Sequence, residues 1–194
     1  VADYYVSETG QVTVDQHVSL TNLTSRNFAT SYQLKLPEVD DVRGDLPLTV
    51  TRISDESAVV DIRFADEVLG IGQTRRFTIS YTASSAANKG EVWEVVIPRL
   101  DTQSEEDEFE LRLHIPTGLG SAININPPPN NTWRDGDNTV YGFSGEVWKD
   151  GAIAASFGNF TVWDFRLKYD IGESRANIHL PPDTGEQTVF YMSI

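Results

Sequence analysis

A short polar stretch in the second half of the chain carries side chains of the kind that bind metal ions. Within four residues, Asp135, Asp137 and Asn138 present carboxylate and amide oxygens around Gly136. Calcium prefers oxygen ligands of this type, although the stretch lacks the twelve-residue spacing that ends in a bidentate glutamate. We therefore consider two interpretations, a calcium site at these three residues or a solvated turn, and we predict no other cofactor.

Four tryptophans are the next candidates, because aromatic rings with a polar edge can stack on a ligand such as a sugar. Trp163 shares the apolar phase of an alternating segment, and Trp93 precedes a nearly continuous apolar run, so both are expected in the core. Trp133 and Trp148 lie beside turn residues and are the candidate ligand-binding residues. The alternative is that they cover the ends of a β-sandwich.

The sequence offers little for catalysis. It has no cysteine, and its glycine-rich stretches match neither a nucleophile elbow nor a dinucleotide-binding loop. Its three histidines, His17, His114 and His179, occupy the polar phase of alternating segments and are expected to face solvent. A metal triad would need them to converge, and no local spacing achieves this. We predict that the chain is not an enzyme.

The elements that would position these residues are strands, because hydrophobic side chains recur at every second position. Such alternation runs through residues 12–20, 58–64, 77–81, 109–115 and 163–169. Residues with turn chemistry separate the runs and predict connections between strands. The predicted turns lie at residues 7–10, 40–44, 88–90, 135–136, 149–151 and 183–185.

One phrase occurs four times: an aliphatic residue, any residue, a second aliphatic residue and then proline. The prolines are Pro37, Pro98, Pro116 and Pro181. Proline cannot donate a hydrogen bond to a ladder, so the phrase predicts strand ends. The intervals from Pro37 to Pro116 and from Pro98 to Pro181 are both about 80 residues, which suggests either an internal duplication or repeated use of the same strand-end chemistry.

Many short strands with frequent turns predict an all-β fold of two tandem antiparallel β-sandwich domains of immunoglobulin-like type. The first would span residues 1–86 and the second residues 87–194, with residues 172–194 either completing the second domain or starting a third unit. The boundary is placed where alternation gives way to small and polar residues near residues 84–89.

The charge of the chain limits its partners. With 15 basic and 29 acidic residues, the formal net charge is −14, which disfavours nucleic acid and anionic membrane surfaces as partners. No apolar run approaches the length of a membrane span, so we expect no direct membrane insertion of this segment.

Five blocks distributed over nearly the whole chain resemble a known family. They are NLTSRNFATSYQLKLP (residues 22–37), FADEVLGIGQTRRFTISYT (64–82), NKGEVWEVVIPRL (88–100), AASFGNFTVWDFRLKY (154–169) and IHLPPDTGEQTVFYMSI (178–194). In this order they resemble the N-terminal extracellular β region of transglutaminase-like membrane proteins from uncultivated candidate-phylum bacteria. The resemblance implies a surface-exposed region followed, in the parent protein, by a transglutaminase-like domain and membrane segments.

The resemblance implies a location and a role for the chain. The family's catalytic Cys-His-Asp set has no counterpart here, because the chain lacks cysteine. We therefore expect a non-catalytic extracellular spacer or interaction region of a bacterial cell-envelope protein, anchored to the membrane through regions outside this chain. Its role would be to position a neighbouring transglutaminase-like domain, and its partner would be a protein or another component of the cell envelope whose identity the sequence does not give. The alternative is an adhesin or a carbohydrate-binding module that uses Trp133 and Trp148.

Overall fold

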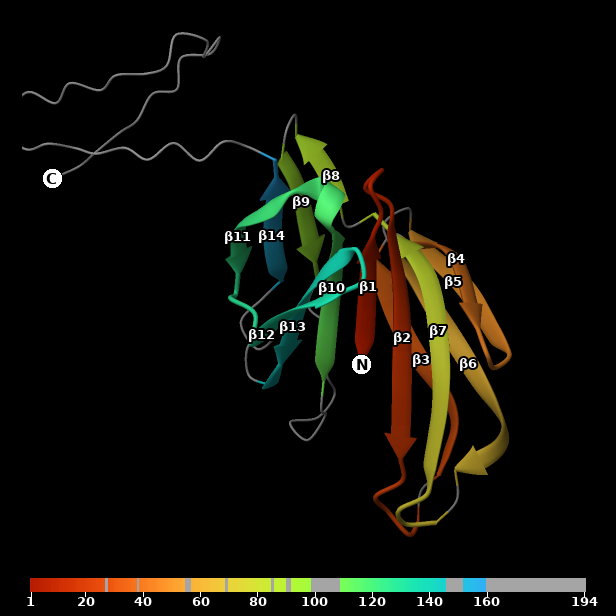
Figure 1. Cartoon of the computed structure of the whole chain (residues 1–194). Coiled ribbons are helices and arrows are strands. Elements are labelled where there is room, and N and C mark those ends of the chain that lie inside the picture. Colours follow the sequence, from red (N-terminus) through yellow and green to blue (C-terminus); the bar gives the residue numbers. More distant parts are fainter. Residues whose placement is uncertain are drawn as a thin grey trace, which may run out of the picture. The chain divides into compact units, whose positions relative to one another are not determined.

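The fold is seen in a computed structural model of the chain (Figure 1). It describes residues 1–26, 28–37, 39–54, 57–68, 70–84, 86–89, 92–98, 109–145 and 152–159. These residues all fall within one compact unit, Val1–Phe160. The predicted strand at residues 163–169 and the predicted extra unit at residues 172–194 lie outside the described residues.

The described part of the chain consists of strands and one short 3₁₀ turn. The first seven strands are β1 (Ala2–Val6), β2 (Val12–Thr21), β3 (Ala29–Pro37), β4 (Val39–Gly44), β5 (Leu48–Ser54), β6 (Ser57–Val68) and β7 (Thr74–Ala83). The others are β8 (Ala86–Lys89), β9 (Val92–Ile97), β10 (Glu110–Pro116), β11 (Ser121–Asn126), β12 (Asn131–Asp135), β13 (Asn138–Ser144) and β14 (Ile153–Gly158), and the 3₁₀ turn is η1 (Thr117–Leu119). Within these ranges, no helix has the length and hydrophobicity needed to cross a membrane.

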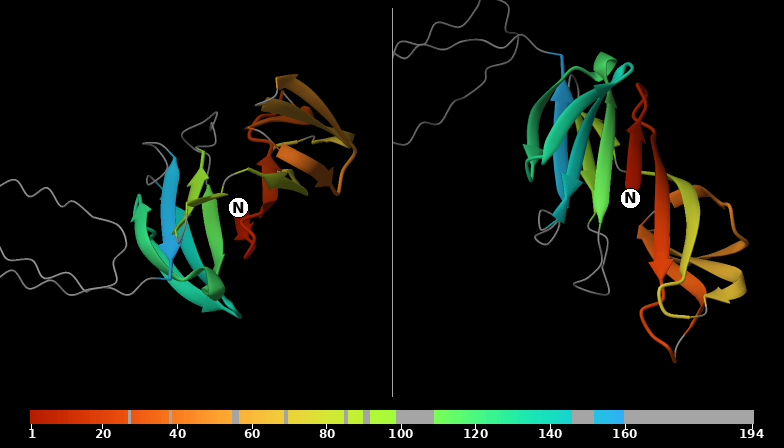
Figure 2. Two further views of the ribbon diagram at one scale, coloured as in Figure 1. Left: turned by 90° about the horizontal axis from the view of Figure 1, so that it is seen from above. Right: turned by 60° about the horizontal axis from the view of Figure 1, so that its bottom comes forward.

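The strands form three sheets, of which the largest has seven strands in the order β12-β13-β10-β1-β2-β7-β4. A four-stranded sheet has the order β11-β14-β9-β8, and a three-stranded sheet has the order β3-β6-β5. In the large sheet β1 lies between β2 and β10, as Figure 2 shows from two further sides. It pairs antiparallel with β2 but parallel with β10, from Ala2 opposite Leu111 to Tyr5 opposite His114.

One face of the seven-stranded sheet carries the core. Tyr4 lies opposite Val14 on one side and Leu113 on the other, and all three side chains are almost completely buried. Residues two positions along each strand share this face, because side chains alternate across a sheet. The core therefore runs from β13 to β7 without a break in register.

Both smaller sheets pack on that same face. Phe77 of β7 contacts Tyr32 of β3 and Phe64 of β6, with ring centroids 5.4 Å and 5.7 Å apart. Tyr141 of β13 contacts Phe157 of β14 with centroids 5.7 Å apart. The opposite face of the seven-stranded sheet, here called the open face, has none of these ring contacts and carries polar side chains.

The all-β, sandwich-like fold predicted from the sequence is confirmed. Alternating residues 12–20, 58–64 and 77–81 lie in β2, β6 and β7, and those at 109–115 lie in β10 except Phe109, which directly precedes it. The proline phrase also behaves as predicted in the described residues, because Pro37 and Pro116 end β3 and β10 and Pro98 directly follows β9. Pro181 lies outside the described part of the chain.

The prediction of a turn at residues 40–44 is wrong. These residues belong to β4, which pairs with β7 at the edge of the seven-stranded sheet. The register shifts between Asp40 and Arg43, and Asp41 adopts a left-handed conformation with φ of 51°. Asp tolerates this conformation better than most residues do, so the same chemistry that forms turns here forms a bulge in an edge strand.

The division into domains at residues 86 and 87 stays a prediction. Hydrogen bonding in the seven-stranded sheet crosses this position in sequence, because β1 from the first segment pairs with β10 from the second. The β1–β10 pair is consequently the place where the two segments meet in one sheet. We refer to this strand pair as the seam.

Candidate functional site

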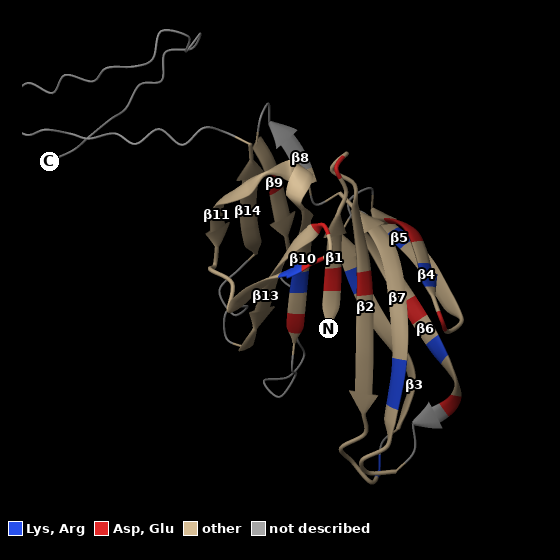
Figure 3. Cartoon of the chain, viewed as in Figure 1, with Lys and Arg blue, Asp and Glu red and all other residues tan. Residues whose placement is uncertain are grey.

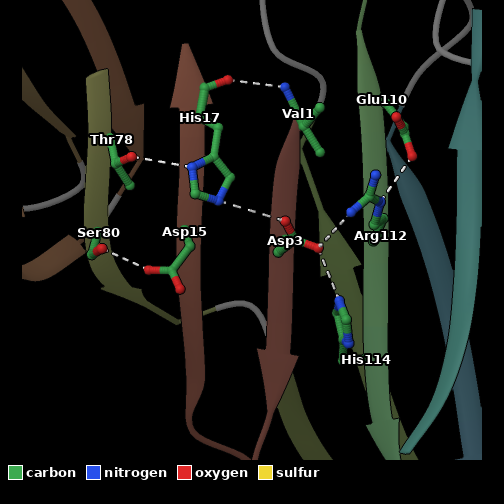
Figure 4. Close-up of polar contacts among 9 residues, drawn as sticks. All are labelled: Val1, Asp3, Asp15, His17, Thr78, Ser80, Glu110, Arg112 and His114. Atoms are coloured by element: carbon green, nitrogen blue, oxygen red, sulfur yellow. Dashed lines mark hydrogen bonds and ion pairs between the residues drawn. The ribbon is translucent and has the colours of Figure 1, made fainter. Parts of the chain in front are cut away.

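The main polar cluster of the described residues lies on the open face at the seam. It spans four neighbouring strands, β7, β2, β1 and β10, and Figure 4 shows its side chains. Register places Asp3 opposite Asp15 of β2 and opposite Arg112 of β10. Strands distant in sequence thus bring acidic and basic side chains into one row.

The centre of the cluster is a buried pair, Asp3 and His114. The Nε2 atom of His114 lies 3.0 Å from Oδ1 of Asp3, and each residue is only 6% exposed. Because a carboxylate can only accept hydrogen bonds, Nε2 of His114 donates to an ionised Asp3. A buried polar group needs such a partner, and this bond adds a side-chain link between β1 and β10 to the main-chain hydrogen bonds of the paired strands.

The other ring nitrogen of His114, Nδ1, is buried without a hydrogen-bond partner. The ring of Tyr5 stacks on the imidazole, with centroids 4.3 Å apart. Burial, together with the negative charges of Asp3 and Asp15, raises the pKa of the Tyr5 hydroxyl. The stacked ring thus covers the histidine from solvent on a face that is otherwise open.

The prediction that His114 faces solvent is therefore wrong. The alternation placed it correctly on the polar face, since Leu113 and Ile115 on either side of it belong to the core. It is buried because the parallel neighbour strand supplies Tyr5 directly opposite it. His17 is exposed as predicted, with its side chain 55% accessible.

Two further side chains with ring or guanidinium nitrogens approach Asp3. Nε2 of His17 lies 3.9 Å from Oδ2 of Asp3, and Nη1 of Arg112 lies 4.0 Å from Oδ1. Arg112 also donates from Nε to Oε1 of Glu110 at 2.8 Å, and this bond raises the pKa of the guanidinium. Asp3 thus has the nitrogen atoms of His114, His17 and Arg112 within 4.0 Å of its carboxylate oxygens.

On the β2 side, hydroxyl groups complete the cluster. Nδ1 of His17 lies 3.1 Å from Oγ1 of Thr78, and the Ser80 hydroxyl donates to Oδ1 of Asp15 at 2.6 Å. Asp15 and Asp3 lie opposite each other, an arrangement that like charges disfavour. The bonds to Ser80 and His114 draw the two carboxylates toward different neighbours and so reduce the repulsion.

Two histidines and an aspartate do converge here, which local spacing did not predict. The signal is absent from the sequence because the convergence depends on the parallel register of β1 and β10. Among the described residues, however, no group of three or more His, Asp or Glu side chains is arranged to hold a metal ion. The cluster's hydrogen bonds join neighbouring strands, and its arrangement suits a structural joint.

The residues predicted to bind calcium lie in the hairpin between β12 and β13. Asp135 and Asn138 are paired at its end, Gly136 has φ of 57°, and Asp137 accepts a bond from the Thr117 amide through its main-chain oxygen. Glycine at the first position of a two-residue loop is typical of tight hairpins. The three side chains are close in sequence within a turn, and calcium binding there stays a prediction.

The two candidate tryptophans have different outcomes. Trp148 lies outside the described residues. Trp133 lies on β12 with 38% of its surface exposed, opposite Val140, which is in turn opposite His114. The row continues to Tyr5, which is also 38% exposed. Tyr5 is an aromatic residue on the same face that the sequence reasoning missed, because only the register reveals it.

The fold and the polar cluster together define the class of this protein as an all-β scaffold with a buried polar pair at its seam. No protein-family model matches the chain, and the comparison with curated proteins gives no match. Similarity is found among solved structures, in which M1 zinc metallopeptidases share the fold.

A mutant of the M1 zinc metallopeptidase from Deinococcus radiodurans, bound to a Tyr-Ser-Ala substrate, has a TM-score of 0.50 and 14% sequence identity. The match covers 79% of this chain and 40% of the peptidase chain. A second structure of the M1 zinc metallopeptidase from the same organism gives a TM-score of 0.45 at 12% identity, covering 79% and 41%. At such identity the similarity concerns the fold alone, over less than half of the peptidase's length.

Proposed function

We propose that this chain is a non-catalytic spacer and interaction region that positions a neighbouring domain of a cell-envelope protein. The observation that carries the proposal is the continuous seven-stranded sheet, on one face of which both smaller sheets pack. A continuous hydrogen-bonded sheet resists bending between its two ends better than two domains on a flexible linker do. The buried Asp3–His114 pair adds a directional link at the seam.

The identity of the neighbouring domain is part of the proposal. The resemblance to the β region of transglutaminase-like membrane proteins favours a transglutaminase-like domain, an extracellular location and a membrane anchor outside this chain.

Two experiments test this function. Reading the sequence that flanks the chain in its gene should reveal a signal peptide upstream and a Cys/His/Asp domain with membrane spans downstream. A gene without any further domain would contradict the positioning role. The purified chain should also show no peptidase or transglutaminase activity on general substrates, and turnover abolished by His114→Ala would overturn the proposal.

A second candidate, carbohydrate binding, is favoured by one observation. Tyr5 and Trp133 are half-exposed aromatic residues in the same row of the open face, with Arg112 and Glu110 in the neighbouring rows. Rings and charged side chains side by side can bind the apolar face and the hydroxyl groups of a sugar.

Titration with soluble polysaccharides tests this candidate through tryptophan fluorescence. The carbohydrate hypothesis predicts a saturable change that Trp133→Ala or Tyr5→Ala removes, and Trp148→Ala tests the other predicted residue. Fluorescence that polysaccharides leave unchanged would eliminate this candidate. The spacer function would be unaffected by that result.

A further inference from the structure

Three large apolar side chains are exposed at one end of the first sandwich-like half. They are Leu23, which is 68% exposed, Phe28, which is 50% exposed, and Ile71, which is 67% exposed. Leu23 and Phe28 lie between β2 and β3, and Ile71 lies between β6 and β7. We call these three residues the apolar tip. Apolar side chains that gather on a surface commonly mark a place of contact with a partner or a membrane.

The two loops that carry the tip are bonded to each other. The Asn22 amide donates to the Gln73 carbonyl at 2.9 Å, and the Gly72 amide donates to the Asn22 carbonyl at 2.8 Å. Register places Ala29, the residue after Phe28, opposite Val68 at the end of β6. The two loops that carry these three residues therefore lie at the same end of the strands, at the bottom of Figure 1.

Local conformation holds the tip in a projecting form. Gly70 and Gly72, on either side of Ile71, have φ values of 84° and 80°, which favour glycine. The Asn22 side chain accepts a bond from the Thr24 amide at 2.9 Å and so shapes the turn that carries Leu23. Such a tip presents its apolar residues without the entropic cost of ordering a free loop.

The charge around the tip differs from that of the whole chain. Residues 20–28 and 70–76 contain Arg26, Arg75 and Arg76 and no acidic residue, and the nearest acidic residues in sequence are Asp66 and Glu67 at the end of β6. Arg75 lies over the ring of Phe64 and 3.9 Å from Asp66, whereas Arg26 and Arg76 are exposed. Figure 3 shows basic residues at the lower end of β7, where it leads to the tip.

We propose that the apolar tip contacts an anionic lipid surface. Leu23, Phe28 and Ile71 enter the interfacial layer of the bilayer, and Arg26 and Arg76 contact the headgroup phosphates. Projecting apolar residues beside cations suit such a surface, because burial of apolar area and attraction to anionic lipid act together. The net charge of the whole chain led us to expect no anionic membrane partner, and the lack of a long apolar run led us to expect no direct membrane insertion. The tip differs from the whole chain in its local charge, and it would enter only the interfacial layer without spanning the bilayer.

The proposal is tested by flotation of the full chain with lipid vesicles. The chain should float with vesicles of equal parts phosphatidylglycerol and phosphatidylcholine, and much less with phosphatidylcholine alone. The double variant Leu23→Ser, Ile71→Ser should bind about tenfold more weakly, because two large apolar groups no longer enter the interface. The variant Arg26→Gln, Arg76→Gln should lose about tenfold at low salt and little at high salt.

A matched control uses Val50→Ser, Ile53→Ser on β5. These side chains are 39% and 61% exposed on the same half of the molecule, but β5 pairs with the end of β6 opposite the tip. The control should bind vesicles as the unchanged chain does, and the thermal midpoints of both serine pairs should be alike. Equal binding by tip and control variants would overturn the proposal. So would an absence of vesicle binding, including the case in which the tip instead mediates self-association in sedimentation.

Discussion

The seam and the β12–β13 hairpin contain the same types of residue and use them differently. At the seam, Asp3 is buried and accepts a hydrogen bond from His114. In the hairpin, Asp135 and Asp137 lie in an exposed turn whose main chain makes the contacts. The difference shows that residue type does not decide the role of an aspartate in this fold. The role of an aspartate depends instead on its position in the register and on whether its strand is central or at the edge of the sheet.

The largest effect is expected at the seam. Asp3→Ala should lower the free energy of unfolding by about 3 kcal/mol, because it leaves a buried imidazole without a partner. Asp135→Ala in the hairpin should change it by less than about 0.5 kcal/mol. Urea unfolding of both variants measures the contrast. Similar midpoints for the two would mean that the buried pair contributes no more than an exposed turn residue.

A double-mutant cycle sharpens this prediction. If the effect arises from the Asp3–His114 bond, the losses in Asp3→Ala and His114→Ala should not add in the double variant, with a coupling of about 1–2 kcal/mol. Additive losses would assign the effect to other contacts of Asp3, such as those with Arg112.

The second effect is expected at Gly142 in β13, the strand of the hairpin that pairs with β10 of the seam. This residue pairs with Arg112 on one side and with Asn131 of the hairpin strand on the other. A Cβ there would lie 2.9 Å from a ring carbon of Trp133 and closer still to the Asn131 side chain. Gly142→Ala should therefore cost about 1–3 kcal/mol of stability. In a chain that also carries Asn131→Ala the cost should shrink, and an unchanged cost would contradict this explanation.

The third prediction compares the core face of the sheet with the open face at alkaline pH. Burial raises the pKa of Tyr81, with further contributions from Tyr4, so the folded state keeps its proton above about pH 10, where an unfolded tyrosine ionises. The unfolded state then binds fewer protons, and stability should fall as the pH rises through that value. Tyr81→Phe should reduce the fall more than Tyr5→Phe does. Urea midpoints measured across this pH range test this prediction. A smaller fall in stability for Tyr5→Phe than for Tyr81→Phe would contradict it.

The smallest effect is expected in the hairpin itself. The calcium hypothesis predicts a modest rise in melting temperature on addition of calcium, which Asp135→Ala should abolish and Asp3→Ala should retain. Calorimetry with and without calcium measures this. No response of the unchanged chain would leave the hairpin as an ordinary turn.

Much of the fold could be predicted from the sequence because its signals are local. Alternation in residues 12–20 and 109–115 and the prolines at positions 37, 98 and 116 are written in neighbouring residues. The turn-forming residue types at 40–44 led to a wrong prediction, because a bulge in an edge strand uses the same residue types.

The site could not be predicted in the same way. Asp3 and His114 are distant in sequence, and the parallel pairing that joins them follows no local pattern. The burial of His114 depends on Tyr5, whose position is again a matter of register. The apolar tip has the same origin, because the loops that carry Leu23 and Ile71 are distant in sequence and are joined by the main-chain hydrogen bonds of Asn22.

Hydrogen exchange in increasing urea, read by peptide mass spectrometry, tests most directly the claim that the seam makes one scaffold of two segments. If β1 and β10 join one cooperative sheet, the amides of β2 and β7 and those of β10 and β13 should lose protection at the same urea concentration. In Asp3→Ala the two sets should separate. Separate transitions in the unchanged chain would contradict the account and would favour two independent domains divided at residues 86 and 87.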